Sequence, residues 1–187
     1  MRHVSYAALV LLLATPAWAQ APATITVTSP TLKANEVVPI DHTADGKNES
    51  PALNWSGAPA NTKQFALVYD DPDVVFGGQT FVHWVVYKIP GTATGLPANL
   101  PIDQVTLTGP PEIAGAIQGL SGFKRPFYRG PAPPPGKPHY YHFVVHALDT
   151  TIAVKPNEPP LTRAQLLEAM QGHVLGRGEI VAHYERK

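Results

Sequence analysis

Alternating and continuous apolar runs predict that most of this chain forms β-strands. Between residues 24 and 29, Ile25 and Val27 alternate with threonines, which is the pattern of a strand with one buried face. Residues 80–89 form the longest apolar run and are expected to be covered on both faces of a sheet. The predicted strands are 24–29, 64–70, 80–89, 140–148 and 179–184, with a weaker edge candidate at 36–43.

One helix is well marked near the C-terminus. Thr162 and Gln165 have the spacing of a capping box, and Leu161 and Leu166 stand where a hydrophobic staple would lie. Apolar residues then recur at helical spacing, and Gly176 is expected to stop the helix. The sequence therefore predicts a mainly antiparallel β domain with a single clear helix.

Two long stretches rich in proline and glycine interrupt this pattern. Residues 92–126 show little periodicity and are expected to cross the surface as an irregular connection. Residues 128–138, called the proline-rich loop below, hold five prolines, which fix φ and remove backbone donors. A stiff loop is therefore expected to lead into the strand at 140–148. His139 and Tyr141 lie at that junction, two residues apart and so on one face.

Residues 1–19 have the features of a secretory signal peptide. A short polar start precedes an apolar run over residues 6–14, and Ala17-Trp18-Ala19 matches a cleavage site. The run is too short to span a bilayer, so it indicates export and not a membrane anchor; a buried N-terminal helix is the alternative. We expect a periplasmic or secreted protein whose single domain covers residues 20–187, with no membrane span.

Composition narrows the possible chemistry. The sequence has no cysteine, which removes disulfides, thiol nucleophiles and thiolate metal sites. Lysine plus arginine and aspartate plus glutamate both total 14, and no long block of like charge is present. Nothing in this balance indicates a nucleic-acid partner or a polybasic membrane-binding surface.

Two groups of polar residues stand out against the apolar strands. Asp71 and Asp73 follow the strand at 64–70, where Pro72 is expected to end regular pairing. Taken alone, the two carboxylates could be ordinary turn and cap residues.

The second group centres on a histidine inside the most apolar strand. His83 is expected to share a face with Phe81, Val85 and Tyr87, and a lone histidine there is more often a satisfied core residue than a site. Together with the carboxylates, a second imidazole and a phenol, it forms a polar cluster in an apolar setting. An imidazolium beside a carboxylate, a tyrosine hydroxyl and loop N–H groups can donate to a phosphate-like or carboxylate group.

Four segments, in order, resemble the phosphatidylethanolamine-binding protein family, most closely its bacterial Raf-kinase-inhibitor-like branch. They are Asp71-Pro72-Asp73, 81–90, 128–134 and 136–143, and the resemblance runs from about residue 24 to 184. It implies a large antiparallel sheet packed with a smaller one, flanking helices, and a pocket for small anions such as phosphate and phosphorylethanolamine. The pocket residues implied are Asp71, His83, Gly130, Ala132, Pro134, His139 and Tyr141, with Asp73 and Tyr128 in support.

The chain departs from the family pattern at four places. Val74 and Val75 replace Ala-Pro after the aspartates, which predicts a looser turn. Tyr140 replaces an arginine that would lie on the face opposite the pocket, and Ala132 stands where many bacterial members have cysteine. The long C-terminal helix of eukaryotic members has no counterpart beyond Tyr184, which leaves one pocket wall undefined.

The favoured function is that of an exported, non-catalytic module that binds a small phosphate-bearing or carboxylate ligand. No cofactor or metal is expected, and a protein partner remains open. One alternative is a periplasmic protease inhibitor that acts through residues 92–126. A less favoured alternative is a metal-assisted hydrolase with Asp71, Asp73, His83 and His139 as ligands. The sequence has no H-E-x-x-H spacing, and residues 119–122 fall one position short of a G-x-S-x-G elbow.

Overall fold

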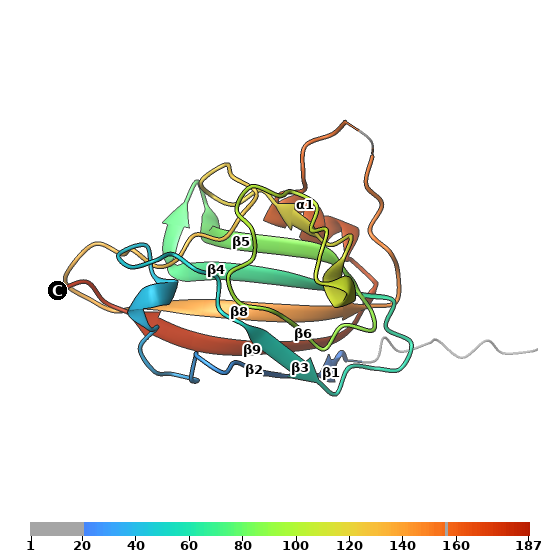
Figure 1. Ribbon diagram of the computed structural model, residues 1–187, viewed down its shortest axis with the longest axis horizontal. Helices are drawn as coiled ribbons and strands as arrows, with labels where there is room; N and C mark the ends of the chain where they lie inside the picture. Colours follow the sequence, from blue (N-terminus) through green and yellow to red (C-terminus); the bar gives the residue numbers. More distant parts are fainter. Residues whose placement is uncertain (1–20, 156) are drawn as a thin grey trace, which may run out of the picture.

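Two β-sheets and one short α-helix make up the computed structural model, which describes residues 21–155 and 157–187 (Figure 1). The predicted signal peptide lies outside the described residues. The large sheet has the order β1-β9-β8-β4-β5-β7, and the small sheet has the order β2-β3-β6. The strands are β1 (Ala23–Thr24), β2 (Thr26–Thr28), β3 (Leu53–Ser56), β4 (Gln64–Phe76), β5 (Gln79–Pro90), β6 (Gly95–Leu96), β7 (Ile117–Gly119), β8 (His139–Leu148) and β9 (Val174–Tyr184).

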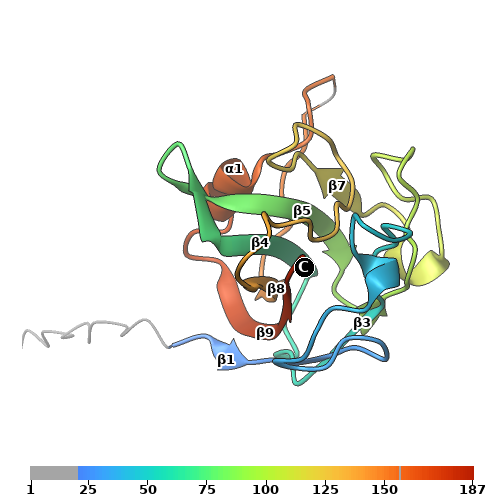
Figure 2. The same ribbon diagram turned by 90° about the vertical axis from the view of Figure 1, so that its left-hand side faces the viewer.

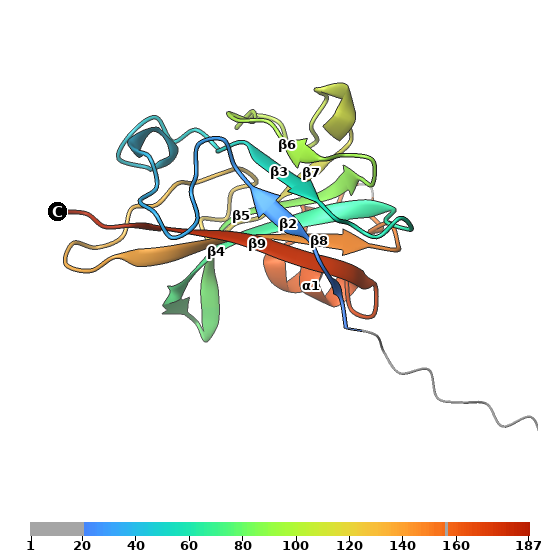
Figure 3. The same ribbon diagram turned by 90° about the horizontal axis from the view of Figure 1, so that it is seen from below.

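The small sheet and α1 (Arg163–Ala169) cover opposite faces of the large sheet, which gives three layers (Figure 3). Trp84 and Val86 of β5 join the core between the two sheets, whereas Val85 and Tyr87 join a second core beneath α1. The prediction of a strand covered on both faces is therefore confirmed. A mainly β fold with a large sheet, a smaller sheet and a C-terminal helix is also confirmed.

The first predicted strand is divided between the two sheets. Ala23–Thr24 pairs with β9 in parallel, and Thr26–Thr28 pairs with β3 in the antiparallel sense. Between them, the Ile25 amide donates to the Arg177 carbonyl oxygen at 3.0 Å. The large sheet is therefore mixed, although all its other pairings are antiparallel.

The prediction of a strand at residues 36–43 is wrong. Val37 makes a single bridge to His183, and the 3-10 turn η1 (Ile40–His42) follows directly after Pro39. Pro39 has no amide hydrogen to donate to a strand ladder, and its φ of −55° suits the entry to a helical turn. A second 3-10 turn, η2 (Pro111–Ile113), lies with β6 and β7 inside the predicted irregular connection.

The start of α1 was predicted correctly and its end was not. The Gln165 amide donates to Thr162 Oγ1 at 3.4 Å, and the Thr162 amide donates to Gln165 Oε1 at 2.9 Å, which completes the capping box. The helix ends at Ala169, because the chain turns back through Gly172, whose φ is +78°. Gly176 instead lies within β9, opposite Ala23.

Candidate functional site

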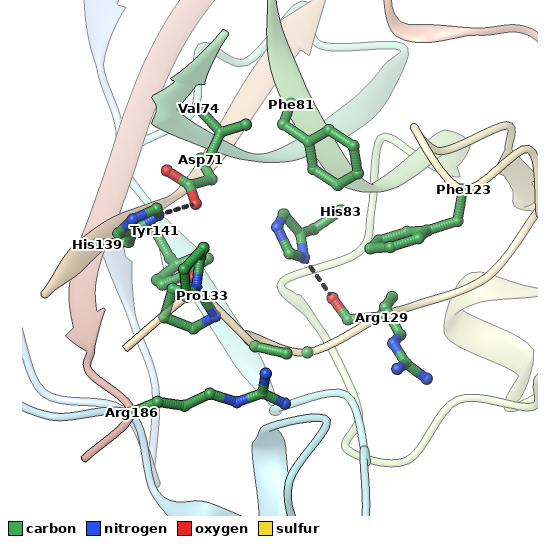
Figure 4. Close-up of a pocket in the computed structure, with 13 residues that line it drawn as sticks. Asp71, Val74, Phe81, His83, Phe123, Arg129, Pro133, His139, Tyr141 and Arg186 are labelled. Carbon is green, nitrogen blue, oxygen red and sulfur yellow. Dashed lines mark hydrogen bonds and ion pairs between the residues drawn. The ribbon is translucent and has the colours of Figure 1, made fainter. Parts of the chain in front are cut away.

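A cavity of about 390 Å³ opens at one end of the large sheet (Figure 4). The proline-rich loop and the C-terminus lie at the end of the molecule that faces the viewer in Figure 2. We call this cavity the main cavity. It is lined by Asp71, Val74, Phe81, His83, Phe123, Arg129, Gly130, Ala132, Pro133, Pro134, His139, Tyr141 and Arg186. All seven residues predicted to form the pocket are in this set, and the two supporting residues, Asp73 and Tyr128, are not. The structure thus brings the seven together, while their role in binding a ligand stays a prediction.

A buried hydrogen bond joins β4 to the first residue of β8. Nδ1 of His139 donates to Oδ2 of Asp71 at 2.8 Å, and both side chains are buried (Figure 4). Within the described residues, the other ring nitrogen of His139 has no hydrogen-bond partner. Because Asp71 holds the Nδ1 hydrogen, this second nitrogen, Nε2, is the atom left to contact a ligand.

Asp73 positions this pair without lining the main cavity. Its amide donates to Oδ1 of Asp71 at 2.9 Å, and its own Oδ2 accepts from the Tyr140 amide at 2.8 Å. Pairing between β4 and β5 jumps from Asp71 to Val75, so Pro72 interrupts the strand but does not end it as predicted. The unpaired residues free Asp73 to tie β4 to β8. Tyr140 is exposed on the face opposite His139, as expected.

His83 shares a face with Phe81, as predicted, but not with Val85 and Tyr87, because β5 contains a β-bulge. Tyr69 pairs with Trp84 and Asp70 pairs with Val82, which leaves His83 as an extra residue. A bulge reverses the alternation of side chains along the strand. His83 therefore lies on the same side as Trp84, its ring centroid 5.1 Å from that of Tyr69, whereas Val85 faces α1.

His83 also differs from the expected donor in its chemistry. Its Nδ1 lies 2.8 Å from the Arg129 carbonyl oxygen, and a carbonyl only accepts, so Nδ1 carries the hydrogen (Figure 4). Burial lowers the pKa of His83 to about 4, and the ring is neutral at pH 7. In the ligand-free protein its Nε2 is consequently a hydrogen-bond acceptor, while Asp71 pairs with the other histidine.

Aromatic rings pack behind Tyr141, which lines the main cavity. Tyr69 stacks on Phe143 at 4.0 Å between centroids and lies 6.0 Å from Tyr141. Burial, and then the nearby Asp71 carboxylate, raise the pKa of Tyr141, so its hydroxyl stays protonated and can donate. Tyr69 does not line the cavity and was not predicted; it is a further apolar position in a strand, with no separate sequence signal.

The proline-rich loop is anchored to the turn at residues 42–48. Tyr128 is buried beneath the loop and donates from its hydroxyl to the His42 carbonyl oxygen at 2.6 Å. The Gly130 amide donates to Oδ1 of Asn48 at 2.8 Å. A side chain at Gly130 could not be accommodated, since a Cβ there would lie 2.2 Å from the same His42 oxygen. Tyr128 is thus an anchor of the loop and not a wall of the cavity.

Two arginines that the sequence analysis missed complete the outer wall. Arg186 donates from Nε to Oδ2 of Asp45 at 2.7 Å, and Tyr184 donates to the same oxygen at 3.1 Å. Figure 4 shows the guanidinium groups of Arg129 and Arg186 on the same side of the cavity, across from Asp71. The C-terminal residues after β9 therefore supply the wall that the sequence left undefined.

The cavity presents several groups that suit an anion. The Tyr141 hydroxyl and the Arg129 guanidinium are donors, and His139 Nε2 becomes one when the ring is protonated. Over residues 21–155 and 157–187, no cluster of three or more His, Cys, Asp or Glu side chains has the arrangement of a metal site. In the same part of the chain, no helix has the length and apolar character needed to cross a membrane.

Comparisons with known proteins converge on one family. The family model for phosphatidylethanolamine-binding proteins matches residues 28–185. A UPF0098 protein of Methanothermobacter thermautotrophicus is 41% identical over 149 residues, which cover 80% of this chain and 91% of that protein. The UPF0098 protein YbcL of Escherichia coli is 37% identical over 168 residues, which cover 86% of this chain and 87% of YbcL.

Solved structures agree over the same span. The crystal structure of E. coli YbcL, described as a member of the mammalian PEBP family, has a TM-score of 0.74 and 34% identity, and the match covers 88% of this chain and 100% of that chain. The PEBP homologue CT736 of Chlamydia trachomatis has a TM-score of 0.74 and 29% identity, with 88% of this chain and 99% of that chain covered.

Proposed function

Since the chain belongs to the phosphatidylethanolamine-binding protein family, we propose that it binds a small phosphate-bearing or carboxylate ligand in the main cavity. Inorganic phosphate and phospholipid head groups are the simplest ligands of this kind. The proposal describes a non-catalytic binding protein that needs no metal or cofactor.

The observation that carries this proposal is the buried pair of His139 and Asp71 next to Tyr141. The 2.8 Å contact with Asp71 fixes the orientation of the His139 ring. A fixed imidazole, which donates from Nε2 when the ring is protonated, and a protonated phenol on one strand face give an anion two donors at little ordering cost. The anchored proline-rich loop holds the opposite wall in place, which lowers this cost further.

His83 adds a preference for a protonated ligand. At neutral pH its Nε2 accepts a hydrogen bond, so it matches the P–OH group of a singly ionised phosphate monoester better than the doubly ionised monoester, which has no P–OH group. The alternative is that the bound anion raises the pKa of His83 and the complex takes up a proton from solvent. Both routes make binding stronger as the pH falls from 8 towards 5.

Binding is tested with inorganic phosphate, by calorimetry or NMR titration of the full mature chain. We expect a dissociation constant on the order of micromolar to millimolar, because the ligand is small and its contacts are partly solvated. The variant His139→Ala should bind at least about tenfold more weakly, since one charge-assisted contact is lost.

His142→Ala is the matched control, because His142 lies on the opposite face of β8 and makes a 3.4 Å contact with Glu179. Its phosphate affinity should equal that of the parent. Equal losses in the two variants, or no phosphate binding by the parent, would place the site elsewhere.

Export is the second part of the proposal and rests on the Ala17-Trp18-Ala19 pattern. The mature protein should begin at Gln20 and be recovered outside the cytoplasm. Intact-mass measurement on natively expressed protein tests this, and a full-length cytoplasmic species would contradict it.

A further inference from the structure

A strip of alternating phenylalanine and arginine side chains borders the main cavity. Phe123, Arg125, Phe127 and Arg129 occur at every second position of the segment that leads into the proline-rich loop. The Arg129 guanidinium carbon lies 5.8 Å from the centroid of Phe123, and that of Arg125 lies 5.8 Å from the centroid of Phe127. Each cation thus lies over a ring, within the distance of a cation–π contact.

These four residues and Ser121 line a second hollow of about 320 Å³, called the side hollow here. Phe123 and Arg129 line both the side hollow and the main cavity. Figure 4 shows this pair at the edge of the main cavity, with the Phe123 ring beside His83. The two hollows are therefore adjacent, and the Phe123–Arg129 pair forms the border between them.

The strip is held in place by backbone hydrogen bonds. The Ser121 amide donates to the Arg125 carbonyl oxygen at 3.0 Å, which closes a tight loop. The Gly122 amide donates to the Val82 carbonyl oxygen at 2.8 Å, and this contact ties the loop to β5. A fixed surface loses little conformational entropy when a ligand lies along it.

The cations of the strip have no close ion-pair partner. In the part of the chain that the structure describes, no carboxylate lies within ion-pair distance of Arg125 or Arg129. By contrast, Arg163 and Arg177 are paired with Asp70 and Glu179 at 3.1 Å and 2.9 Å. Two free guanidinium groups next to an anion cavity favour a second negative charge on the ligand.

We infer that the ligand carries a second anionic group, a carboxylate or a second phosphate, which lies in the side hollow and binds Arg125 and Arg129. This inference rests on the proposed function, because it places the first phosphate in the main cavity. It also predicts that a ligand with an ammonium group at the far end, as in ethanolamine, binds less well, since that group would face two guanidinium cations.

Three phosphate esters of equal chain length test the inference: 6-hydroxyhexanoic acid phosphate, its primary amide, and 6-aminohexyl phosphate. We expect the carboxylate to bind about three- to fivefold more tightly than the amide, as for a solvent-accessible charged contact. The amine should bind most weakly. Calorimetry at low salt gives all three dissociation constants.

Arg125→Gln separates the side hollow from the main cavity, because Arg125 does not line the latter. In this variant the preference for carboxylate over amide should fall to about twofold or less, since one of the two cations is gone. Lys137→Gln is the matched control: Lys137 is an exposed cation in the proline-rich loop that lines neither hollow, and its loss should leave the preference intact.

The outcomes separate the two proposals. If inorganic phosphate binds but the three esters bind equally, the second anionic group is wrong and the proposed function stands. If the carboxylate preference survives Arg125→Gln, it does not arise in the side hollow and the inference is overturned. If neither phosphate nor any ester binds, the proposed function fails and this inference fails with it.

Discussion

At the end of β4, the two faces of the large sheet carry similar residues but differ in which charged side chains form ion pairs. Asp71 faces the main cavity and pairs with His139, and the neighbouring Asp70 faces α1 and pairs with Arg163 at 3.1 Å. Each face also buries a histidine whose pKa burial lowers to about 4, namely His83 and His146.

The difference lies in the arginines. On the α1 face, Arg163 and Arg177 each have a carboxylate partner, whereas Arg129 on the cavity face has none in the described residues. Residue type alone would mark both faces as polar clusters. The cavity face therefore keeps one arginine, Arg129, without a carboxylate partner next to a hollow, while Arg186 on the same face is paired with Asp45.

The largest expected effect applies to both faces and concerns acid stability. His83 and His146 have folded-state pKa values of about 4, below the ordinary 6.5, so the unfolded chain binds protons that the folded chain does not. The resulting stability is present above pH 6.5 and is lost as the pH falls towards 4. For each of these histidines, the free energy of unfolding should fall by about 2 kcal/mol as the pH is lowered from 7 to 5.

Urea unfolding at these two pH values measures the loss, and His146→Leu isolates the α1 face. The contribution of His146 should vanish in this variant, so its loss between the two pH values should be smaller than that of the parent by about 2 kcal/mol. An unchanged loss would mean that His146 titrates normally in the folded protein.

The next effect separates the faces by exchanging each aspartate for its amide. Asp71→Asn removes the charge that orients His139, and phosphate should bind about tenfold more weakly. Asp70→Asn weakens only a partly exposed ion pair with Arg163, so it should cost no more than about 1 kcal/mol of stability and leave binding unchanged. An equal loss of phosphate affinity in Asp70→Asn and Asp71→Asn would contradict this difference between the two faces.

The smallest effect sharpens the role of His83 on the cavity face. The affinity for a phosphate monoester should rise about three- to tenfold between pH 8 and pH 5.5, because His83 Nε2 needs a proton from the ligand or from solvent. Sulfate carries no proton in this range and serves as the matched probe. If sulfate gains affinity in parallel, a histidine of the cavity, His83 or His139, takes up the proton; if only the phosphate monoester does, the ligand supplies it. No rise with either anion would exclude His83 from the binding contact.

The sequence predicted the strands that form the site better than it predicted their register. The alternation of side chains correctly placed His139 and Tyr141 on one face of β8. The start of this strand alternates between buried and exposed positions, so residues two apart face the same way. The bulge at His83 was missed, since β5 is apolar on both faces and its pattern does not reveal an extra residue. The family resemblance identified His83 as a pocket residue, even though the alternation of side chains wrongly placed Val85 and Tyr87 on its face.

Long-range contributions to the site had no local signal. Arg186 lines the main cavity because β9 ends beside it, and this follows only from the order of strands in the sheet. Phe123 and Arg129 lie in or next to the irregular connection, where no periodicity indicates which side chains face inward. Asp45, which holds Arg186, is 141 residues away in the sequence.

Changes in the anchoring turn at residues 42–48 are expected to alter the width of the main cavity without altering the residues that line it. The turn holds the proline-rich loop through Tyr128 and Gly130, and it holds the C-terminal wall through the contact of Asp45 with Arg186. None of its residues lines the main cavity. A substitution or a one-residue insertion in this turn would shift both walls together, so the width of the cavity can diverge between relatives while its chemical groups stay the same.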